Sequence, residues 1–340
     1  MRYFVTGSTG LLGSNLVFEL LNAGHSVKAL VRSASKATAV FGSPLPAGLE
    51  LVVGDLEDVA AFAPALAGCE AVFHTAAYFR EYFQPGNHWD TLKRLNVTAT
   101  RQLLDAAEAQ GVACFVHTSS SGTIDPQIQD ESSPPNPYAR KNLYFKSKVE
   151  SEAEVHDFLA QQPAPALRVV MILPGWMMGP YDSAPTASGQ VILDLVNGQM
   201  PGYFDGGTST VDARDVAQAM IAAARQGRSG ERYIVGGEYL SLQELSRTVG
   251  EVAGIKTATR KIPNAVIMGV ATLSEFWAKV SGKPTVMTRE GIGTLLEKHH
   301  LNSYKAQQEL GASFRPIEHT LRDELRWYAE RGKVKTPIKL

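Results

Sequence analysis

Cysteine is scarce in this sequence of 340 residues, which contains only Cys69 and Cys114. Two thiols exclude a disulfide-dense scaffold and any zinc site built on several thiolates. The eight histidines are scattered, and the adjacent pair His299 and His300 has no further ligand at metal-binding spacing. We therefore predict no metal site, and this use of cysteine is typical of the reducing cytoplasm.

Long apolar runs and an excess of charge of one sign are also missing. The nearest candidate for a membrane span, residues 265–273, falls far short of the roughly 18 residues needed, so no span is predicted. The 33 Lys and Arg against 34 Asp and Glu leave a net charge of −1. This balance predicts neither a nucleic-acid partner nor an anionic membrane held by electrostatics. The sequence begins on a strand-like run without a signal peptide, so we expect a cytoplasmic protein.

The composition is that of a folded protein, with 44% hydrophobic and 20% charged residues. Short β-rich runs alternate with helical patterns through the first half of the chain. This alternation predicts βαβ units and an α/β fold with a doubly wound parallel sheet of the Rossmann type. The predicted strands cover residues 2–5, 26–31, 49–53, 71–75, 113–118 and 167–173, and the predicted helices cover 11–23, 89–110 and 141–159.

The pattern changes after Pro174, where Gly, Pro and Met become frequent up to Gly207 without a clear period. Ser241 followed by Glu244 then indicates a capping box at the start of a helix. Later elements are predicted as a strand end and helix within 211–225, a strand at 232–235, and helices at 241–253, 263–280 and 320–331. We predict a Rossmann domain from residues 1–173 plus about 208–236, and a smaller mixed α/β substrate-binding domain from 174–207 plus 237–340.

A glycine-rich loop follows the first predicted strand and opens the first predicted helix. Gly7, Gly10 and Gly13 have separate tasks there: a tight turn, the close approach of a pyrophosphate, and close packing of helix on strand. The helix presents free N–H groups and the positive end of its dipole to phosphate. The order of strand, loop and helix therefore predicts dinucleotide binding rather than a merely structural turn. Further contacts to the same ligand are predicted for Thr9, Leu11 and Leu12.

The end of the second predicted strand distinguishes the two nicotinamide dinucleotides. An NAD site usually places Asp or Glu there, whereas this sequence has Arg32 with Lys36 nearby. A guanidinium forms charge-assisted hydrogen bonds with a 2′-phosphate, which favours NADP(H) over NAD(H), although the site also admits NAD(H). The alternative is that Arg32 is a solvated charge or stacks on adenine. Asp55 and Leu56 are predicted near the adenine, but Asp55 also suits a helix N-cap or a turn.

Tyr144 and Lys148 lie four residues apart on a predicted helix and therefore share a face. The hydroxyl-rich residues 118–121 lie at the carboxyl end of a predicted parallel strand, where open α/β sheets bind ligands. Hydride reduction of a ketone creates an alkoxide that needs a proton, which Tyr144 can supply. A neighbouring ammonium favours phenolate, so Lys148 is predicted to lower the pKa of Tyr144 and to hold the nicotinamide ribose. The alternative is an ordinary pair of surface residues on an amphipathic helix.

Together these residues resemble the extended short-chain dehydrogenase/reductase family over nearly the whole chain. Residues 74–77 look like the family segment that lines the cofactor, and Asn96 falls where the family keeps a structural asparagine. Residues 118–123 are most similar to the dihydroflavonol 4-reductase-like branch. The resemblance implies that Ser120 is catalytic, with Ser121 as the second choice. It also implies cofactor contacts at Thr75, Ala76, Ala77 and Pro174.

Two departures separate the sequence from the nucleotide-sugar epimerases that the resemblance also covers. Those enzymes typically carry Val-Tyr-Gly after the catalytic serine, whereas residues 123–125 here are Thr, Ile and Asp. Many also have an arginine that grips the nucleotide shortly before the position of Val211, and residues 206–210 contain none. Arg214 comes later, and its alternative role is an ion pair with a nearby carboxylate. A cationic clamp for a diphosphate is therefore not expected.

Apolar and aromatic side chains follow the predicted strands on the substrate side. They suit a hydrophobic or aromatic carbonyl substrate, and the alternative for each is an ordinary core position. Trp176 is the strongest candidate, and Asp125 stands where plant reductases of this branch carry a substrate-contacting asparagine. The candidates for this surface are Tyr78, Phe79, Tyr82, Phe83, Ser121, Asp125, Trp176, Met177, Met178, Met200, Tyr203 and Phe204.

These observations predict an NAD(P)H-dependent oxidoreductase, and more specifically an NADPH-dependent reductase of a ketone or aldehyde on a hydrophobic or aromatic small molecule. The alternative is an NAD-dependent nucleotide-sugar epimerase or dehydratase, and a third class is a non-catalytic NADPH sensor. The resemblance also implies a homodimer, because the helices predicted at 89–110 and 141–159 form a four-helix bundle in many family members.

Overall fold

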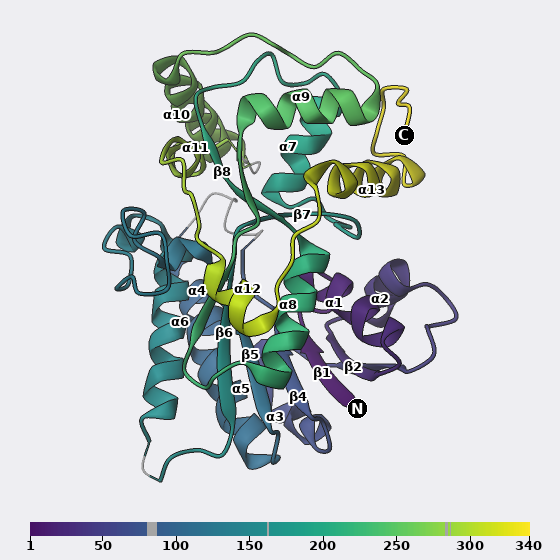
Figure 1. Cartoon of the computed structure of the whole chain (residues 1–340), viewed down its shortest axis with the longest axis vertical. Helices are drawn as coiled ribbons and strands as arrows, with labels where there is room; N and C mark the ends of the chain where they lie inside the picture. The colour runs from purple at the N-terminus through teal and green to yellow at the C-terminus, as the bar shows by residue number, and fades with distance from the viewer. Residues whose placement is uncertain (80–86, 162, 283–284, 286) are drawn as a thin grey trace.

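Seven short parallel strands form the central sheet of the molecule (Figure 1). The computed structural model describes residues 1–79, 87–161, 163–282, 285 and 287–340. The strands of this sheet are β1 (Arg2–Thr6), β2 (Ser26–Val31), β3 (Leu49–Val53), β4 (Ala71–His74), β5 (Cys114–Thr118), β6 (Arg168–Pro174) and β9 (Arg232–Val235). Their order is β3-β2-β1-β4-β5-β6-β9. The strand order reverses between β1 and β4, and ligands of open α/β sheets bind at the carboxyl ends beside such a reversal.

Helices cover both faces of this sheet, which is why most of its strands are continuous apolar runs. The first face carries α1 (Leu11–Asn22), α2 (Ala34–Phe41), α8 (Ala213–Gln226) and α12 (Tyr304–Leu310). The second group comprises η1 (Leu56–Asp58), α3 (Val59–Phe62), η2 (Ala63–Leu66), α4 (Trp89–Leu92), η4 (Lys93–Thr98), α5 (Ala99–Ala109) and α6 (Leu143–Leu159). Side chains of β1 alternate between the faces: Tyr3 and Val5 pack with α1 and α8, and Phe4 packs with α3 and α5.

A smaller three-stranded sheet lies beyond the carboxyl ends of the large one, with its own apolar core. Its strands are β7 (Trp176–Met178), β8 (Gly207–Asp212) and β10 (Glu238–Ser241), where β7 is parallel and β10 antiparallel to β8. The helices of this part are α7 (Ala187–Val196), α9 (Leu242–Ala253), α10 (Asn264–Ser281), α11 (Arg289–Leu296) and α13 (Ile317–Glu330). All five contribute buried residues to one core cluster, which is distinct from the two clusters on the large sheet.

The two sheets meet at Gly175, the single residue between β6 and β7. A Cβ atom at this position would lie 2.7 Å from the carbonyl oxygens of both Gly236 and Ser209. Three chain segments therefore cross here at a separation that only glycine allows. This crossing fixes where the smaller sheet stands relative to the carboxyl ends of the large one.

The α/β fold class predicted from the sequence is confirmed, including the doubly wound parallel sheet and the smaller mixed part. The capping box is confirmed at α9, where Ser241 and Glu244 each bond the other's backbone N–H. Residues 174–207 show no clear period, yet the structure has β7 and α7 there, because β7 is only three residues long and α7 is buried around much of its circumference.

The predicted domain boundaries stay a prediction, and two elements lie across them. β8 falls in the range assigned to the Rossmann domain but pairs only with β7 and β10 among the strands that the structure describes. α12 falls in the range assigned to the substrate-binding domain, yet its Ala306 and Leu310 pack in the core cluster of the large sheet. The chain thus passes between the two parts more often than its sequence suggests.

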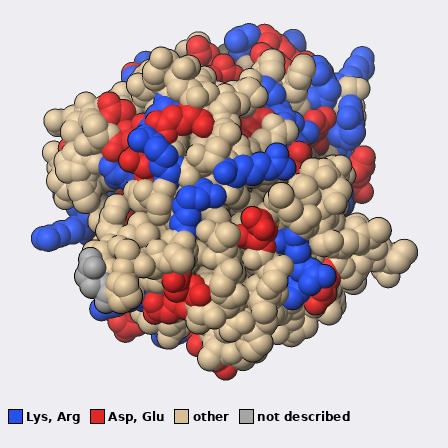
Figure 2. Space-filling view, turned by 60° about the horizontal axis from the view of Figure 1, so that its bottom comes forward, with Lys and Arg blue, Asp and Glu red and all other residues tan. Residues whose placement is uncertain are grey.

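Charged side chains of both signs are interspersed on the face shown in Figure 2, in keeping with the balanced net charge. Among the described residues, no helix is both long enough and apolar enough to cross a membrane.

The crossing at Gly175 generates a stability prediction. Gly175→Ala should lower the free energy of unfolding by about 1–3 kcal/mol, because the new methyl group must displace backbone rather than a flexible side chain. Gly269→Ala is the matched control, since Gly269 lies on α10 with no described atom within 4 Å of an added Cβ. That substitution should stabilise by about 0.5–1 kcal/mol through helix propensity. Denaturant unfolding of both variants measures the two effects, and equal changes of one sign would contradict this account.

Candidate active site

The loop between β1 and α1 packs directly against the end of β4. Gly7 has φ +65°, and a Cβ there would lie 2.6 Å from the backbone nitrogen of Ala76. A Cβ on Gly13 would lie 2.8 Å from Oγ1 of Thr75 and closer still to the carbonyl oxygen of Gly7. These two glycines are therefore required by the protein's own packing.

Gly10 is different, because its backbone is extended and the nearest atom to an added Cβ is 3.4 Å away. No contact within the described structure requires glycine there as strongly as at Gly7 and Gly13. Gly10 also provides no side-chain cap for α1, and the first turn of α1 contains no acidic residue. The first N–H groups of the helix, from Leu11 to Gly13, therefore have no intrahelical acceptor, which is the arrangement that binds anions at helix N-termini.

A buried serine that the sequence analysis missed holds this loop in place. The hydroxyl of Ser8 donates a hydrogen bond of 2.8 Å to the carbonyl oxygen of Leu30 near the end of β2. Thr9, next in sequence, is half-buried. The Ser8 bond therefore holds the glycine-rich loop against β2. Arg32, which is predicted to distinguish NADP(H) from NAD(H), directly follows this strand. A serine beside the first glycine was the only sequence signal for this role.

The predicted adenine end of the site contains exposed cations and a capping aspartate. Arg32 and Lys36 are exposed, and neither forms an ion pair with another described residue. The carboxylate of Asp55 accepts a hydrogen bond of 3.0 Å from the backbone N–H of Glu57, so Asp55 is the N-cap of η1. This is the alternative role given for Asp55, and its predicted contact with adenine stays a prediction. Leu56 is half-buried beside it.

The segment after β4 is fixed by Asn96, whose side chain is buried. Oδ1 of Asn96 accepts from the backbone N–H of Tyr78 at 2.7 Å, and Nδ2 donates to the carbonyl oxygen of Tyr78 at 3.1 Å. Nδ2 also donates to the hydroxyl of Ser147 on α6 at 3.0 Å. Asn96 lies in η4, a π-helical segment within the single helix predicted for residues 89–110. The widened turn places this amide between β4 and α6.

Thr75 and Ala76 are held against the end of β1. The hydroxyl of Thr75 donates to the carbonyl oxygen of Thr6 at 2.7 Å, and the N–H of Ala76 donates to Oγ1 of Thr6 at 3.3 Å. The same Thr6 oxygen lies 2.8 Å from Nδ1 of the buried His74. These bonds bring the predicted residues 75–77 next to the glycine loop, as a shared cofactor site requires.

Lys148 lies buried at the carboxyl end of β5, one helical turn after Tyr144. Its Nζ donates a hydrogen bond of 2.8 Å to the carbonyl oxygen of Thr118 and lies 5.9 Å from the centre of the Tyr144 ring. The Tyr144 ring packs against Phe79, with 4.6 Å between ring centres. The structure thus brings together Tyr144, Lys148 and a residue that follows β4.

Burial governs the proton affinities of this pair. It lowers the pKa of Lys148 to about 8, and the carboxylate of Glu152 opposes part of that shift. It raises the pKa of Tyr144 above its ordinary value. The sequence analysis instead predicts a lowered pKa for Tyr144. The structure differs because the Lys148 ammonium donates to the Thr118 carbonyl, and desolvation of the phenol by burial raises the pKa of Tyr144.

The serines at the end of β5 have different partners. Ser119 is buried and donates to the carboxylate of Glu152, whereas Ser120 is half-buried and its hydroxyl accepts a 3.1 Å hydrogen bond from the N–H of Gly122. Ser120 is the N-cap of η5 (Ser121–Thr123), and the half-buried Ser121 is the first residue of that turn. Of Ser119 and Ser120, Ser120 therefore has the more accessible hydroxyl.

Glu152 is a second residue of this site that the sequence analysis missed. Its carboxylate accepts from the hydroxyls of Ser119 and Thr123 and lies 3.5 Å from the guanidinium of Arg232. This buried cluster joins the residue that follows β5 to η5, α6 and β9. Glu152 follows Lys148 by four residues on one face of α6, and that spacing was the available signal.

The predicted substrate-side residues are dispersed along the junction of the two sheets. Trp176 is half-buried on β7 against the core of the smaller part, together with Met200 and Tyr203, while Met177 packs against the large sheet. Pro174 is buried at the end of β6. Met178 and Phe204 are buried in the smaller core, the alternative role given for them. Tyr82 and Phe83 lie outside the described residues.

Asp125 has a structural role in the loop after η5. Its carboxylate accepts a hydrogen bond of 2.9 Å from the N–H of Gln127, and its own N–H donates to the hydroxyl of Ser133 at 2.7 Å. Its predicted contact with substrate stays a prediction.

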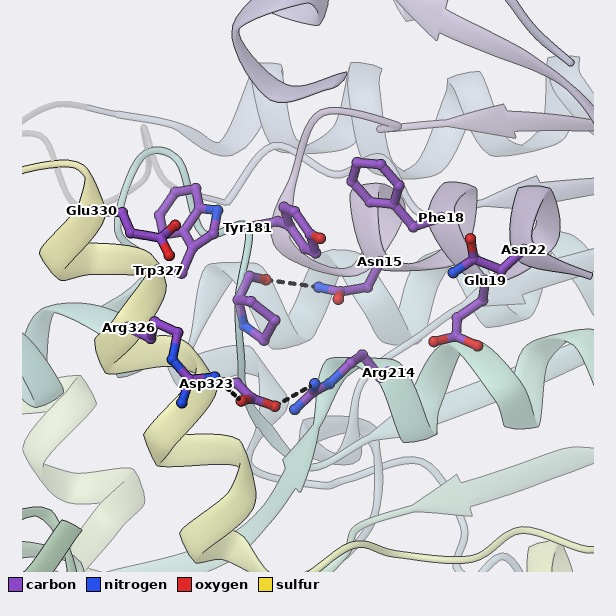
Figure 3. A pocket seen from close by; sticks show the side chains of 11 residues that line it. Asn15, Phe18, Glu19, Asn22, Tyr181, Arg214, Asp323, Arg326, Trp327 and Glu330 are labelled. Atoms are coloured by element: carbon purple, nitrogen blue, oxygen red, sulfur yellow. Dashed lines mark hydrogen bonds and ion pairs between the residues drawn. The ribbon is translucent and has the colours of Figure 1, made fainter. Parts of the chain in front are cut away.

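Arg214 is tied into ion pairs, in agreement with the alternative given for it. Its guanidinium lies 2.7 Å from the carboxylates of both Asp212 and Asp323. The side chain lines a separate cavity of about 370 Å³ between α1, α8 and α13 (Figure 3). In that cavity the amide of Asn15 donates to the carbonyl oxygen of Pro180 at 2.9 Å. None of the predicted cofactor or catalytic residues is among those that line it.

The geometry of the glycine loop, the β5 end and α6 agrees with the comparison to known families. The model of the NAD dependent epimerase/dehydratase family matches residues 3–236. The chain belongs to this family. The match confirms the resemblance to extended short-chain dehydrogenases/reductases, and members of this family are NAD(P)-dependent enzymes of oxidoreductase type.

Relatives of this NAD dependent epimerase/dehydratase family member extend over its whole length. A Synechocystis sp. protein named "Putative dihydroflavonol 4-reductase" is 32% identical over 98% of this chain and 96% of its own. A 4-hydroxy-2-methyl-3-oxo-4-farnesyl-3,4-dihydroquinoline-1-oxide ketoreductase of Stigmatella aurantiaca is 30% identical over 99% of both chains. The crystal structure of gox2253 has a TM-score of 0.81 at 32% identity and covers 98% of this chain and 99% of that one.

The lowered pKa of Lys148 generates a prediction on stability and pH. Because its native pKa of about 8 lies below the ordinary 10.5, the unfolded chain binds more protons than the native protein between these values. The contribution of Lys148 to stability is therefore least favourable below pH 8 and improves as the pH rises toward 10.5. The full change is about 3 kcal/mol.

The test compares the free energies of unfolding of wild type and Lys148→Met, without nucleotide, from pH 8 to pH 10.5. As the pH rises, the difference between the two proteins should shift in favour of wild type by about 3 kcal/mol. Lys146→Met is the control, since solvent still reaches the Lys146 ammonium on the same helix. A difference between wild type and Lys148→Met that does not change with pH would contradict the burial of a charged Lys148.

Proposed function

We propose that this family member is an NADPH-dependent reductase of a ketone or aldehyde on a hydrophobic or aromatic small molecule. The observation that carries the proposal is the position of Tyr144, Lys148 and Ser120 around the carboxyl end of β5, beside the residues that follow β4. A protonated phenol, an ammonium and an accessible hydroxyl there are the groups that carbonyl reduction needs.

The residues at the carboxyl ends of β1, β2 and β4 fit a bound dinucleotide. Gly10 leaves space at an uncapped helix N-terminus for the pyrophosphate, and exposed Arg32 is available to a 2′-phosphate. Lys148 lies at the position where a cation can hold the nicotinamide ribose. Bound NADPH would supply the hydride for the carbonyl carbon.

Tyr144 acts as the proton donor to the carbonyl oxygen. Burial raises the pKa of its phenol, so the group keeps its proton at neutral pH and can donate it as the alkoxide forms. The pKa of about 8 for Lys148 leaves most of its ammonium charged at pH 7, and this charge stabilises the phenolate that remains after transfer.

Ser120 orients the carbonyl. Its oxygen accepts from the N–H of Gly122, so its own hydrogen remains available to the substrate oxygen. Ser119 cannot take this role, because it is buried and donates to Glu152. Ser121 remains the second choice.

The chemistry of the surrounding side chains supports an apolar substrate. Phe79 packs on the Tyr144 ring, and Trp176, Met200 and Tyr203 share the apolar cluster at the base of the smaller part. The Stigmatella relative, by its name, reduces a ketone on a farnesylated quinoline. We also propose a cytoplasmic location and a homodimer through the helical segments 89–110 and 141–159.

The alternative to a carbonyl reductase is an NAD-dependent nucleotide-sugar epimerase or dehydratase. Such an enzyme needs cations for a diphosphate, and Arg214 is committed to Asp212 and Asp323. The ion pairs favour the reductase.

Tyr144→Phe tests the role of the phenol. The variant should lose about a hundredfold or more in kcat for NADPH-dependent reduction of an aromatic ketone or aldehyde, because the proton donor is gone. NADPH affinity should change little. Tyr138→Phe removes the same hydroxyl from an exposed side chain six residues earlier and should leave kcat unchanged. Unaltered turnover in Tyr144→Phe would exclude Tyr144 as the acid, as expected of a cofactor sensor.

Arg32→Ala tests the choice of dinucleotide. Loss of a charge-assisted hydrogen bond to the 2′-phosphate should raise the Kd for NADPH about tenfold or more while the Kd for NADH stays nearly constant. Arg2→Ala is the control, since Arg2 is exposed at the start of β1, at the opposite end of the strands. Equal effects of Arg32→Ala on both nucleotides would show that Arg32 does not read the phosphate.

A further inference from the structure

Helix α10 exposes an apolar stripe along its whole length. The exposed fractions of the residues on this stripe are 53% for Val266, 43% for Val270, 63% for Leu273, 62% for Phe276, 64% for Trp277 and 63% for Val280. No other helix of the described structure exposes a comparable set of large apolar residues. Figure 1 shows α10 at the periphery of the smaller part, away from α1 and α2.

The geometry of the helix gathers these residues on one face. At 3.6 residues per turn, the six side chains and Gly269 fall within an arc of about 120°. The opposite face carries Ile267, Ala271 and Ala278, which are buried against the protein. Folding of the chain therefore uses one face of α10 and leaves a second apolar face in contact with water, which is unfavourable unless something covers it.

The charge around this stripe is strongly asymmetric. Residues 254–289 contain six Lys and Arg and one acidic residue, a local net charge of +5 in a chain whose total is −1. Two of these cations have carboxylate partners: Arg289 lies 2.9 Å from Glu275, and Lys261 lies 3.5 Å from Asp205 outside the segment. The balanced total, which argued against an anionic membrane partner, conceals this concentration of positive charge beside an exposed apolar face.

We propose that α10 docks on an anionic phospholipid bilayer and lies in its interfacial plane. An apolar face with Phe and Trp at one end, in a segment where cations outnumber acids, has the composition of a helix that binds at a membrane surface. The helix does not cross the bilayer, in keeping with its length and polarity.

Charge favours a lipid over a second copy of the chain as the occupant. A two-fold interface brings the same patch of both copies together. On α10 this would place two segments of charge +5 side by side, whereas anionic headgroups neutralise them.

Docking would also orient the catalytic side of the molecule. The inner face of α10 packs through Ile267 and Ala271 in the cluster that contains Trp176, Met200 and Tyr203. The substrate-side residues thus stand close behind the docked helix. If the chain is the carbonyl reductase proposed above, its substrate belongs to the apolar molecules that dissolve in the bilayer.

Vesicle flotation with the full chain tests the docking without reference to catalysis. The protein is mixed with vesicles of phosphatidylcholine alone or with about one third phosphatidylglycerol, at low and high salt. We expect the protein to float with the anionic vesicles and to bind phosphatidylcholine vesicles about tenfold more weakly. High salt should weaken its binding to the anionic vesicles. Leu273→Glu and Trp277→Glu should each reduce binding on the order of tenfold or more, because each removes a large apolar side chain from the interface.

Tyr304→Glu is the matched control, since Tyr304 is 64% exposed, as is Trp277, but lies on α12. It should bind like wild type. Should the α10 variants fold poorly, slower amide exchange of residues 264–281 in wild type on addition of anionic vesicles gives the same answer. Absence of flotation, or flotation that the α10 variants share, overturns the proposal. A dimer in light scattering that Leu273→Glu and Trp277→Glu abolish, without vesicle binding, overturns it in favour of a second copy.

Discussion

The buried ammonium of Lys148 is the group on which the rest of the site depends. It is only 3% exposed, and its partner in the structure is the backbone carbonyl of Thr118 at 2.8 Å. A charge so far from water is tolerated only when the groups around it stay in place. Thr118 is the last residue of β5 and Lys148 lies on α6, so the bond fixes strand and helix in register. Glu152 supplies the compensating charge and ties the serine-rich turn to Arg232 on β9.

Close backbone contact is a second constraint, and it positions the glycine-rich loop against the residues that follow β4. Gly7 and Gly13 bring the β1–α1 loop against Thr75 and Ala76, and Asn96 holds the following residues to α6. The glycine loop and the pair Tyr144 and Lys148 thus lie at the ends of β1 and β5, with β4 between them in the sheet. In the proposed reductase, this arrangement would hold the reacting carbonyl, the phenol of Tyr144 and the nicotinamide within reach of each other.

The sequence predicted the elements whose patterns are local. Strands such as β1 and β6 contain apolar runs after their first residue because helices cover both faces of the sheet. The spacing of Tyr144 and Lys148 places them on one side of any helix, here α6. The raised pKa of Tyr144 could not be predicted, because it follows from tertiary burial.

The same limit applies elsewhere in the chain. Neither β7 nor α7 shows a period, since β7 is very short and α7 is buried on several sides. The role of Glu152 depends on β5 and β9, which are distant in sequence. For α10, the apolar composition was visible in the sequence, but only the fold shows that half of that surface faces water.

In the proposed function, this family member binds NADPH and releases NADP⁺ in each turnover. The most direct measurement is to release and identify the nucleotide in freshly purified, denatured protein, and to titrate the emptied native protein with NADPH and NADH. The account predicts little retained nucleotide and a clear preference for NADPH. Stoichiometric NAD⁺ that survives purification would contradict it, because a nucleotide that is retained and recycled is what a sugar-nucleotide epimerase or dehydratase requires.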